Sequence, residues 1–226
     1  MDNNNVRLIR HQIRSPRSAA VAGIIFSILM TAGMVLMYSV VSDIPADIDR
    51  SWLATWSGTA SVVLIMVPFA GIAFLWFTGV VRDRLGDLED HFFATIYFGS
   101  SIIIVVMLFI WAATVGAIFG SFSAVSYQLV DDDIIIFGFK FMNEIIGNYT
   151  LRMAGVYMTA IGTAWTRTGV MPRWLSGVTF VVAIGFLFFA GTVREARFIF
   201  PGWVFVVSVY ILILNYRRSN EDTLKT

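Results

Sequence analysis

Six long apolar runs, nearly free of charged residues, limit most strongly what this chain can fold into. About 20 such residues span the hydrocarbon core of a bilayer as an α-helix, and the first run, residues 19–41, has 23. Charged residues make up 14% of the chain, against about 25% in a soluble domain. The sequence therefore predicts an all-α, multi-pass transmembrane bundle of six helices. The expected spans are residues 19–41, 57–81, 92–119, 144–165, 175–192 and 198–216.

The first apolar run follows a basic segment, residues 1–18, so a secretory signal peptide is the competing interpretation. The apolar part of a signal peptide has roughly 7–15 residues and ends at a small-residue cleavage site. Residues 19–41 form a longer run that ends at Tyr38–Asp43, which favours a retained membrane helix. A polar tail, residues 217–226, follows the last span.

Lysine and arginine are distributed unevenly between the two sides that six spans would create. Eleven lie on the side of the two terminal segments, and three, Arg50, Arg194 and Arg197, lie on the other. Because cytoplasmic segments carry the excess of basic residues, both termini are expected in the cytoplasm and the protein in the plasma (inner) membrane. Tryptophans concentrate at membrane interfaces. Five of them fall near predicted span ends: Trp52, Trp56, Trp165, Trp174 and Trp203.

The chain lacks the residues on which most hydrolytic and metal chemistry depends. It has no cysteine, and its two histidines, His11 and His91, lie outside the apolar runs. A Ser–His protease or a metalloprotease that works inside the membrane needs histidine within a span. No phosphate-binding GxxxxGK motif is present either. We therefore expect no catalytic residues, no metal or cofactor and no nucleic-acid partner, with the lipid bilayer as the main partner.

One apolar segment, residues 134–165, is different because polar side chains repeat along it. Lys140, Glu144, Asn148 and Arg152 are spaced four apart, with Asn143 beside them. On an α-helix such residues form a slanting polar stripe in which neighbours can pair. Arg152 lies 13 residues before Trp165, or roughly 20 Å into the membrane. An ionisable residue at that depth is a functional-site hypothesis by default.

Two interpretations of this polar stripe stay open. In the first, it forms a substrate or ion path in which Arg152 binds an anion or relays protons. In the second, Glu144 and Arg152 form an ion pair that only fixes the orientation of the helix. As a helix the whole segment would be about 48 Å long, which exceeds a bilayer core of about 30 Å. Residues 131–143 are therefore expected to lie at or above the outer surface.

Two weaker patterns accompany the stripe. Asp131, Asp132 and Asp133 form a weak cation site in one interpretation and solvated loop charge in the simpler one. Ala112, Gly116 and Gly120 have the small-xxx-small spacing that lets membrane helices approach closely. Chance is the alternative explanation of that spacing, since glycine is frequent in transmembrane helices.

The stretches Phe69–Ser100 and Arg173–Gly185 resemble uncharacterised bacterial integral membrane proteins with six short-looped spans. The resemblance implies a fold class, but no activity and no site residues. The leading functional hypothesis is a small transporter or channel-like protein with its polar path along the fourth helix. A non-catalytic scaffold, as a homo-oligomer or a subunit beside another membrane protein, is the alternative. An interfacial lipid-acting enzyme that uses the aspartates is the least favoured, because no nucleophile–base pair can be named.

Overall fold

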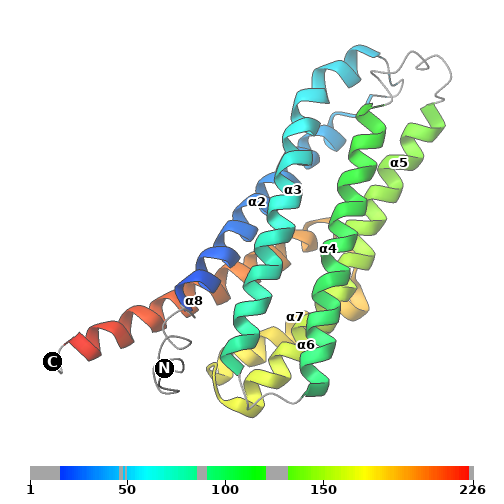
Figure 1. Cartoon of the computed structure of the whole chain (residues 1–226). Coiled ribbons are helices and arrows are strands. Elements are labelled where there is room, and N and C mark those ends of the chain that lie inside the picture. Colours follow the sequence, from blue (N-terminus) through cyan, green and yellow to red (C-terminus); the bar gives the residue numbers. More distant parts are fainter. Residues whose placement is uncertain (1–15, 46–47, 49, 86–90, 121–131, 224–226) are drawn as a thin grey trace, which may run out of the picture.

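A computed structural model describes residues 16–45, 48, 50–85, 91–120 and 132–223 of the 226-residue chain. The regular structure within these ranges is entirely helical (Figure 1). In chain order the elements are α2 (Pro16–Ser42), α3 (Arg50–Leu85), α4 (His91–Gly120), α5 (Asp132–Glu144), the π-helical η4 (Ile145–Thr150), α6 (Leu151–Thr168), α7 (Arg173–Phe189), the 3-10 turn η5 (Arg194–Phe198) and α8 (Ile199–Thr223).

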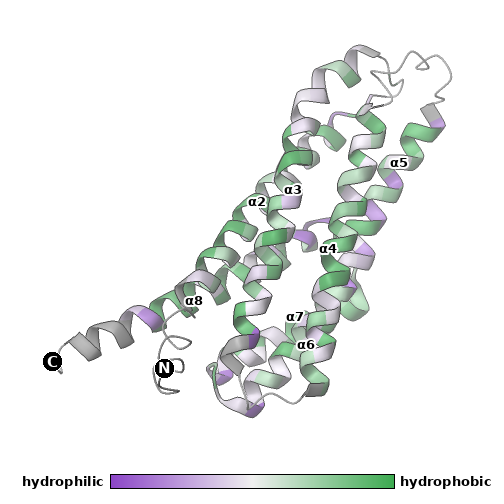
Figure 2. Cartoon of the chain, viewed as in Figure 1, coloured by the Kyte–Doolittle hydropathy of each residue, from purple (hydrophilic) through white to green (hydrophobic). Residues whose placement is uncertain are grey.

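Four of these helices are long and apolar enough to cross a membrane, which confirms an all-helical membrane protein. They are Ser18–Ser42, Ser51–Arg82, Phe92–Gly120 and Arg194–Tyr216. The helix α7 is also apolar but has only 17 residues. Large apolar side chains cover the outside of the bundle, with Val181 72% and Phe188 73% exposed, and green predominates along the helices in Figure 2. A surface of this kind is stable in lipid rather than in water.

The helices pack mostly in chain order. α3 lies between α2 and α4, α4 packs against α5 and α6, α6 packs against α7, and α8 returns to pack against α2. The helical path from Asp132 to Thr168 is unbroken and about 55 Å long, whereas α7 is about 25 Å long. The turn that follows α7 therefore reaches only part of the way along its long neighbour. This length difference positions the site described below.

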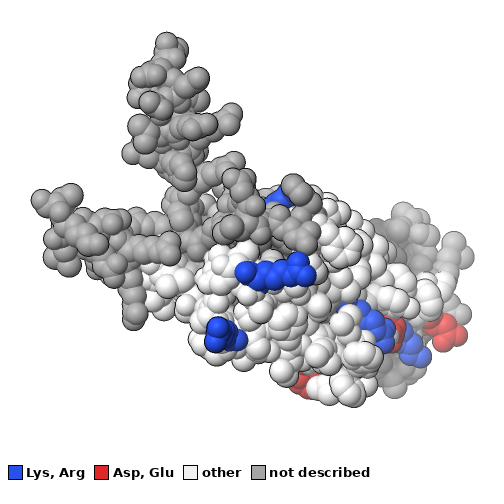
Figure 3. Space-filling view, turned by 90° about the horizontal axis from the view of Figure 1, so that it is seen from below, with Lys and Arg blue, Asp and Glu red and all other residues white. Residues whose placement is uncertain are grey.

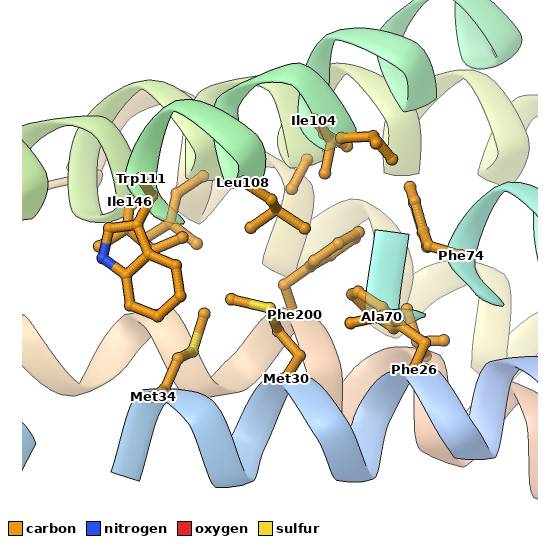
Figure 4. Close-up of a cluster of buried hydrophobic side chains, with 14 of the residues drawn as sticks. Phe26, Met30, Met34, Ala70, Phe74, Ile104, Leu108, Trp111, Ile146 and Phe200 are labelled. Atoms are coloured by element: carbon orange, nitrogen blue, oxygen red, sulfur yellow. The ribbon is translucent and has the colours of Figure 1, made fainter. Parts of the chain in front are cut away.

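An aromatic cluster fills the centre of the bundle. Phe74 lies at its middle, with ring centroids 4.8 Å from Phe26, 5.4 Å from Tyr157 and 5.6 Å from Phe200. Figure 4 shows Phe26, Phe74 and Phe200 pointing toward one another beside Met30 and Leu108. A hydrogen bond also lies within this core, since the hydroxyl groups of Thr78 and Tyr157 are 3.3 Å apart. The core is therefore apolar, with few polar groups.

Three of the tryptophans expected at the interface are buried instead. Trp165 and Trp203 stack in the core with ring centroids 5.8 Å apart, and Trp203 Nε1 donates to Thr179 Oγ1 at 2.9 Å. Trp52 packs against aromatic rings from α4 and α5. Trp174, by contrast, is exposed. Their burial describes contacts within the bundle and not their depth in the membrane, so the position at the interface stays a prediction.

Glycines allow close contact between α6 and α7. A Cβ at Gly155 would lie 3.0 Å from the backbone oxygen of Ala183 and from a side-chain atom of Leu187. At the end of α6, Gly169 adopts φ 66° and its N–H donates to the Trp165 oxygen, a left-handed helix end that glycine favours. Pro172 then directly precedes the first residue of α7.

We expect Gly155→Val to destabilise the protein, because the added side chain would press on the α7 backbone, which cannot move aside. Overpacking of this kind costs about 1–3 kcal/mol, so thermal unfolding in detergent should occur at a lower temperature. The matched control is Gly177→Val, since nothing lies within 4 Å of a Cβ at Gly177. Equal melting temperatures for the two variants would contradict the α6–α7 contact.

Candidate functional site

The long fourth helix contains one π-helical turn, η4, at Ile145–Thr150. Thr150 Oγ1 donates to the oxygen of Ile145, five residues earlier, at 2.7 Å. The threonines farther along the helix, such as Thr159 and Thr163, bond four residues back instead. Gly147 lies inside the turn, where a weak helix former makes departure from α-helical geometry less costly. Single π turns within α-helices occur frequently at functional sites.

The π turn divides the predicted polar stripe. One residue more per turn rotates everything after it by about 100° relative to an unbroken α-helix. Lys140 is exposed and lies before the turn, whereas Arg152 is half-buried and lies after it. Neither side chain lines the polar cavity described next, and Asn143, Glu144 and Asn148 do. The structure thus brings three of the five predicted residues together.

A polar cavity of about 450 Å³ lies where the π turn faces the segment after α7. One wall is Asn143, Glu144, Gly147 and Asn148 from the fourth helix. The opposite wall comes from the end of the α7 turn and from η5, with Val41 of α2 at the side. The residues of that opposite wall are Gly191, Thr192, Val193, Arg194 and Arg197. In Figure 2 hydrophilic colour at this level marks η5 and the facing helix.

Hydrogen bonds hold the cavity walls in place. Arg197 reaches across it, because its Nη1 donates to Asn143 Oδ1 at 3.2 Å while its Nε donates to the Arg194 oxygen at 2.7 Å. On the wall formed by the fourth helix, Asn148 Nδ2 donates to Glu144 Oε2 at 3.1 Å. The Arg194 guanidinium lies over the ring of Tyr38, 4.6 Å from its centroid. The two arginines are thus fixed by an amide, a carbonyl and an aromatic ring, not by carboxylates.

Glycines make this close approach possible. Gly191 adopts φ 82°, a conformation that side chains disfavour, and a Cβ there would lie 3.4 Å from Asn148. A Cβ at Gly147 would lie 4.0 Å from Arg197 Nη2. Gly191 therefore suits the left-handed turn after α7, whereas a Cβ at Gly147 would make at most ordinary van der Waals contact with Arg197.

Opposite charges line the cavity without neutralising one another. Among the described residues, Glu144 forms no ion pair with Arg194, Arg197 or Arg152, so the predicted Glu144–Arg152 pair is not formed. Arg152 lies eight residues beyond Glu144, or about 12 Å along the helix axis, so the two side chains are two turns apart. In addition, Asn148 Oδ1 is buried and accepts no hydrogen bond from the described residues. A sealed structural ion pair rarely leaves such groups unsatisfied, so the arrangement favours a binding cavity.

Arg194 and Arg197 were missed as site residues by the sequence reasoning. They lie about 50 positions after Asn143 and Glu144, and no spacing rule links the two segments. One signal was present. Two of the three basic residues assigned to the outer side fall within this short connector, against the usual preference for basic residues in the cytoplasm.

The cavity is closed toward the centre of the bundle. Beneath Arg197 there is only a void of about 10 Å³, lined mainly by apolar side chains that include Met30, Ile146 and Phe200. A space of that size holds at most about one water. The side chains around this level are packed against one another (Figure 4). Among the described residues, apolar packing therefore separates the polar cavity from the centre of the bundle.

The two weaker sequence patterns have different outcomes. Asp131 lies outside the described residues, as does the side chain of Asp132, and Asp133 is exposed, so the weak cation site stays a prediction. Among the described residues no group of three or more metal-ligating side chains occurs. Ala112 is buried, and a Cβ at Gly116 would contact Leu64 of α3, whereas Gly120 has nothing within 4 Å. Part of this small-residue face is thus used inside the bundle.

No protein-family model, curated protein or solved structure matches this chain. This is consistent with a resemblance that implied a fold class and no activity.

We expect Thr150→Val to weaken the π turn, because valine keeps the shape of the buried side chain but removes the bond to the Ile145 oxygen. The loss should lower the free energy of unfolding by about 1 kcal/mol, measured by thermal unfolding in detergent. Thr159→Val is the control, since its hydroxyl makes an ordinary four-residue bond. If Thr159→Val destabilises the protein as much as Thr150→Val, the π turn has no special dependence on this hydroxyl.

Proposed function

We propose that the chain is a membrane transport protein whose substrate binds in the polar cavity between the π turn and η5. The observation that supports this proposal is that residues of opposite charge, Glu144 on one wall and Arg194 and Arg197 on the other, line one cavity of an otherwise apolar bundle. Charged side chains on both walls of one cavity in an apolar bundle make that cavity a candidate substrate or ion pathway. Of the predicted path, Asn143, Glu144 and Asn148 belong to this site, and the two arginines complete it.

The apolar packing beneath Arg197 favours a transporter over an open channel. An open pore needs a continuous water-filled path, and the aromatic cluster around Phe74 leaves none at the centre of the bundle. A transporter instead exposes its site to one side at a time. The polar cavity corresponds to a state that is open on one side only.

The cavity lies near one membrane surface. Tyr38, which stacks with Arg194, is 20 residues after Ser18 and therefore about 30 Å along α2, close to the full thickness of the hydrocarbon core. Arg82, Arg167 and Arg173 are exposed at the opposite end of the bundle, and Figure 3 shows basic side chains among uncharged surface in the view from that end. With six spans, this end faces the cytoplasm and the cavity faces outward.

A scaffold role is the second candidate function. Ala113 and Ala117 form an exposed small-residue row on α4, and such rows suit helix–helix contacts between membrane proteins. This role predicts a defined oligomer in mild detergent, and it requires neither the unpaired charges nor the cavity.

Transport can be tested by reconstitution into liposomes with a panel of protons, small ions and a phospholipid that carries a fluorescent acyl chain. We expect at least one of these to cross faster than in empty liposomes. Arg197→Gln should lower that rate about tenfold or more, because hydrogen bonds to charged groups contribute about 1.5–3 kcal/mol. The matched control is Arg173→Gln, which removes the same charge at the opposite end. Wild-type rates equal to those of empty liposomes for the whole panel would contradict transport.

The proposed topology can be tested by single-cysteine labelling, because the chain has no cysteine of its own. A membrane-impermeant maleimide applied to intact cells should label Ser42→Cys and Thr192→Cys. It should label Arg173→Cys only after the membrane is permeabilised. Arg173 is the first residue of α7 and Thr192 follows its last residue, Phe189, so labelling of both from the same side would show that α7 does not cross the membrane.

A further inference from the structure

A second cavity, almost entirely apolar, adjoins the polar one. It has a volume of about 370 Å³ and lies between α7 and the start of α8. Its apolar lining includes Val182, Phe186 and Phe189 from α7 and Ile199 from α8. Thr192 and Val193 line both cavities, so the two spaces lie on either side of the same short turn.

Along the membrane normal, the polar cavity lies nearer the surface and the apolar cavity lies nearer the hydrocarbon core. This is the order of the headgroup and the acyl chains in a membrane lipid. The polar cavity lies at the level of Tyr38, near the end of the first apolar run. From the shared turn, the apolar cavity follows α7 back from Phe189 to Val182, about 10 Å along the helix axis. This direction leads from the membrane surface toward the hydrocarbon core. An acyl chain that enters here meets mostly apolar side chains, with Thr192 and Glu195 at the end of the cavity near the turn.

The polar cavity offers separate partners for a phosphate and for an ammonium group. Arg197 uses Nε and Nη1 within the protein, and its Nη2 has no hydrogen-bond acceptor among the described residues. Guanidinium groups match phosphate oxygens in geometry and charge. On the other wall, Glu144 is exposed and receives one bond to Oε2 from Asn148. Its other oxygen is therefore available to a donor-bearing cation.

We propose that the two cavities form one site for a phospholipid with a phosphate and a primary ammonium in its headgroup, the chemistry of phosphatidylethanolamine. The proposal deepens the proposed function by naming the ligand class of the same cavity. Arg194 and Arg197 bind the phosphate, Glu144 binds the ammonium, and the space between α7 and α8 takes an acyl chain. Basic pockets between membrane helices are known to bind lipid headgroups, and here the opposite charge beside the arginines adds selectivity for a zwitterion with N–H donors.

Binding is tested on the full chain, delipidated in detergent, by native mass spectrometry with added lipids of identical acyl chains. The lipids are phosphatidylethanolamine, phosphatidylcholine, which has no ammonium N–H, and phosphatidylglycerol, which has no ammonium. Wild type should bind phosphatidylethanolamine about tenfold more tightly than either of the others. Arg197→Gln should weaken that binding about tenfold, whereas Arg173→Gln should leave it unchanged.

Two further variants separate the two ends of the site. Glu144→Gln should abolish the preference for phosphatidylethanolamine over phosphatidylglycerol. Gly185 lines the apolar cavity, and nothing lies within 4 Å of a Cβ there, so Gly185→Leu fills the cavity without a clash. It should weaken binding of the long-chain lipid about tenfold and leave binding of soluble phosphoethanolamine at its wild-type level.

The outcomes are distinguishable from those of the transport test because no flux is measured. Equal affinity of wild type for the three lipids, or unchanged binding in Arg197→Gln, overturns the proposal. Tighter binding of phosphatidylglycerol than of phosphatidylethanolamine overturns the role of Glu144 and indicates a purely anionic ligand. Selective phosphatidylethanolamine binding without any flux supports the lipid site and rejects transport.

Discussion

The difference in length between neighbouring helices determines where polar groups meet in this protein. The helix from Asp132 to Thr168 is about twice as long as α7, which packs against it. The connector after α7 therefore ends beside the middle of the long helix and brings its arginines there. In hydrocarbon those arginines would be very unfavourable. In the structure Arg197 bonds to Asn143 and to a backbone carbonyl, and Arg194 lies over the ring of Tyr38, contacts that lower this cost.

The π turn provides the other half of the same site. It turns Asn148 and Glu144 toward the connector, and it leaves Gly147 where Arg197 needs space. The apolar interior then isolates the site from the opposite membrane surface, since the aromatic rings around Phe74 fill the centre of the bundle. The cavity, its charges and its closed floor are thus consequences of two local features, a short helix and one irregular turn.

Much of the fold could be predicted from the sequence, because apolar runs of 20 or more residues have few alternatives. The third expected span, residues 92–119, differs from α4 by one residue at each end. Residues 131–143, expected at or above the outer surface, are helical from Asp132 onward in α5, and their position relative to the membrane stays a prediction. The second helix was less well predicted, since α3 begins at Arg50 rather than at residue 57. Its first turns carry serine and threonine, which hydropathy assigns to a loop.

The site itself was only partly predictable. Four-residue spacing identifies one face of a regular α-helix, so it correctly related Glu144 to Asn148 but failed for Arg152 beyond the irregular turn. The partners Arg194 and Arg197 depend on how far α7 reaches along its neighbour, a tertiary property that no local pattern contains. The extra residue in Ile145–Thr150 also has a geometric consequence. Because the turn holds one residue more than an α-helical turn, deleting one residue from it would return the segment to regular α-helix and leave the residues on either side facing as they do now.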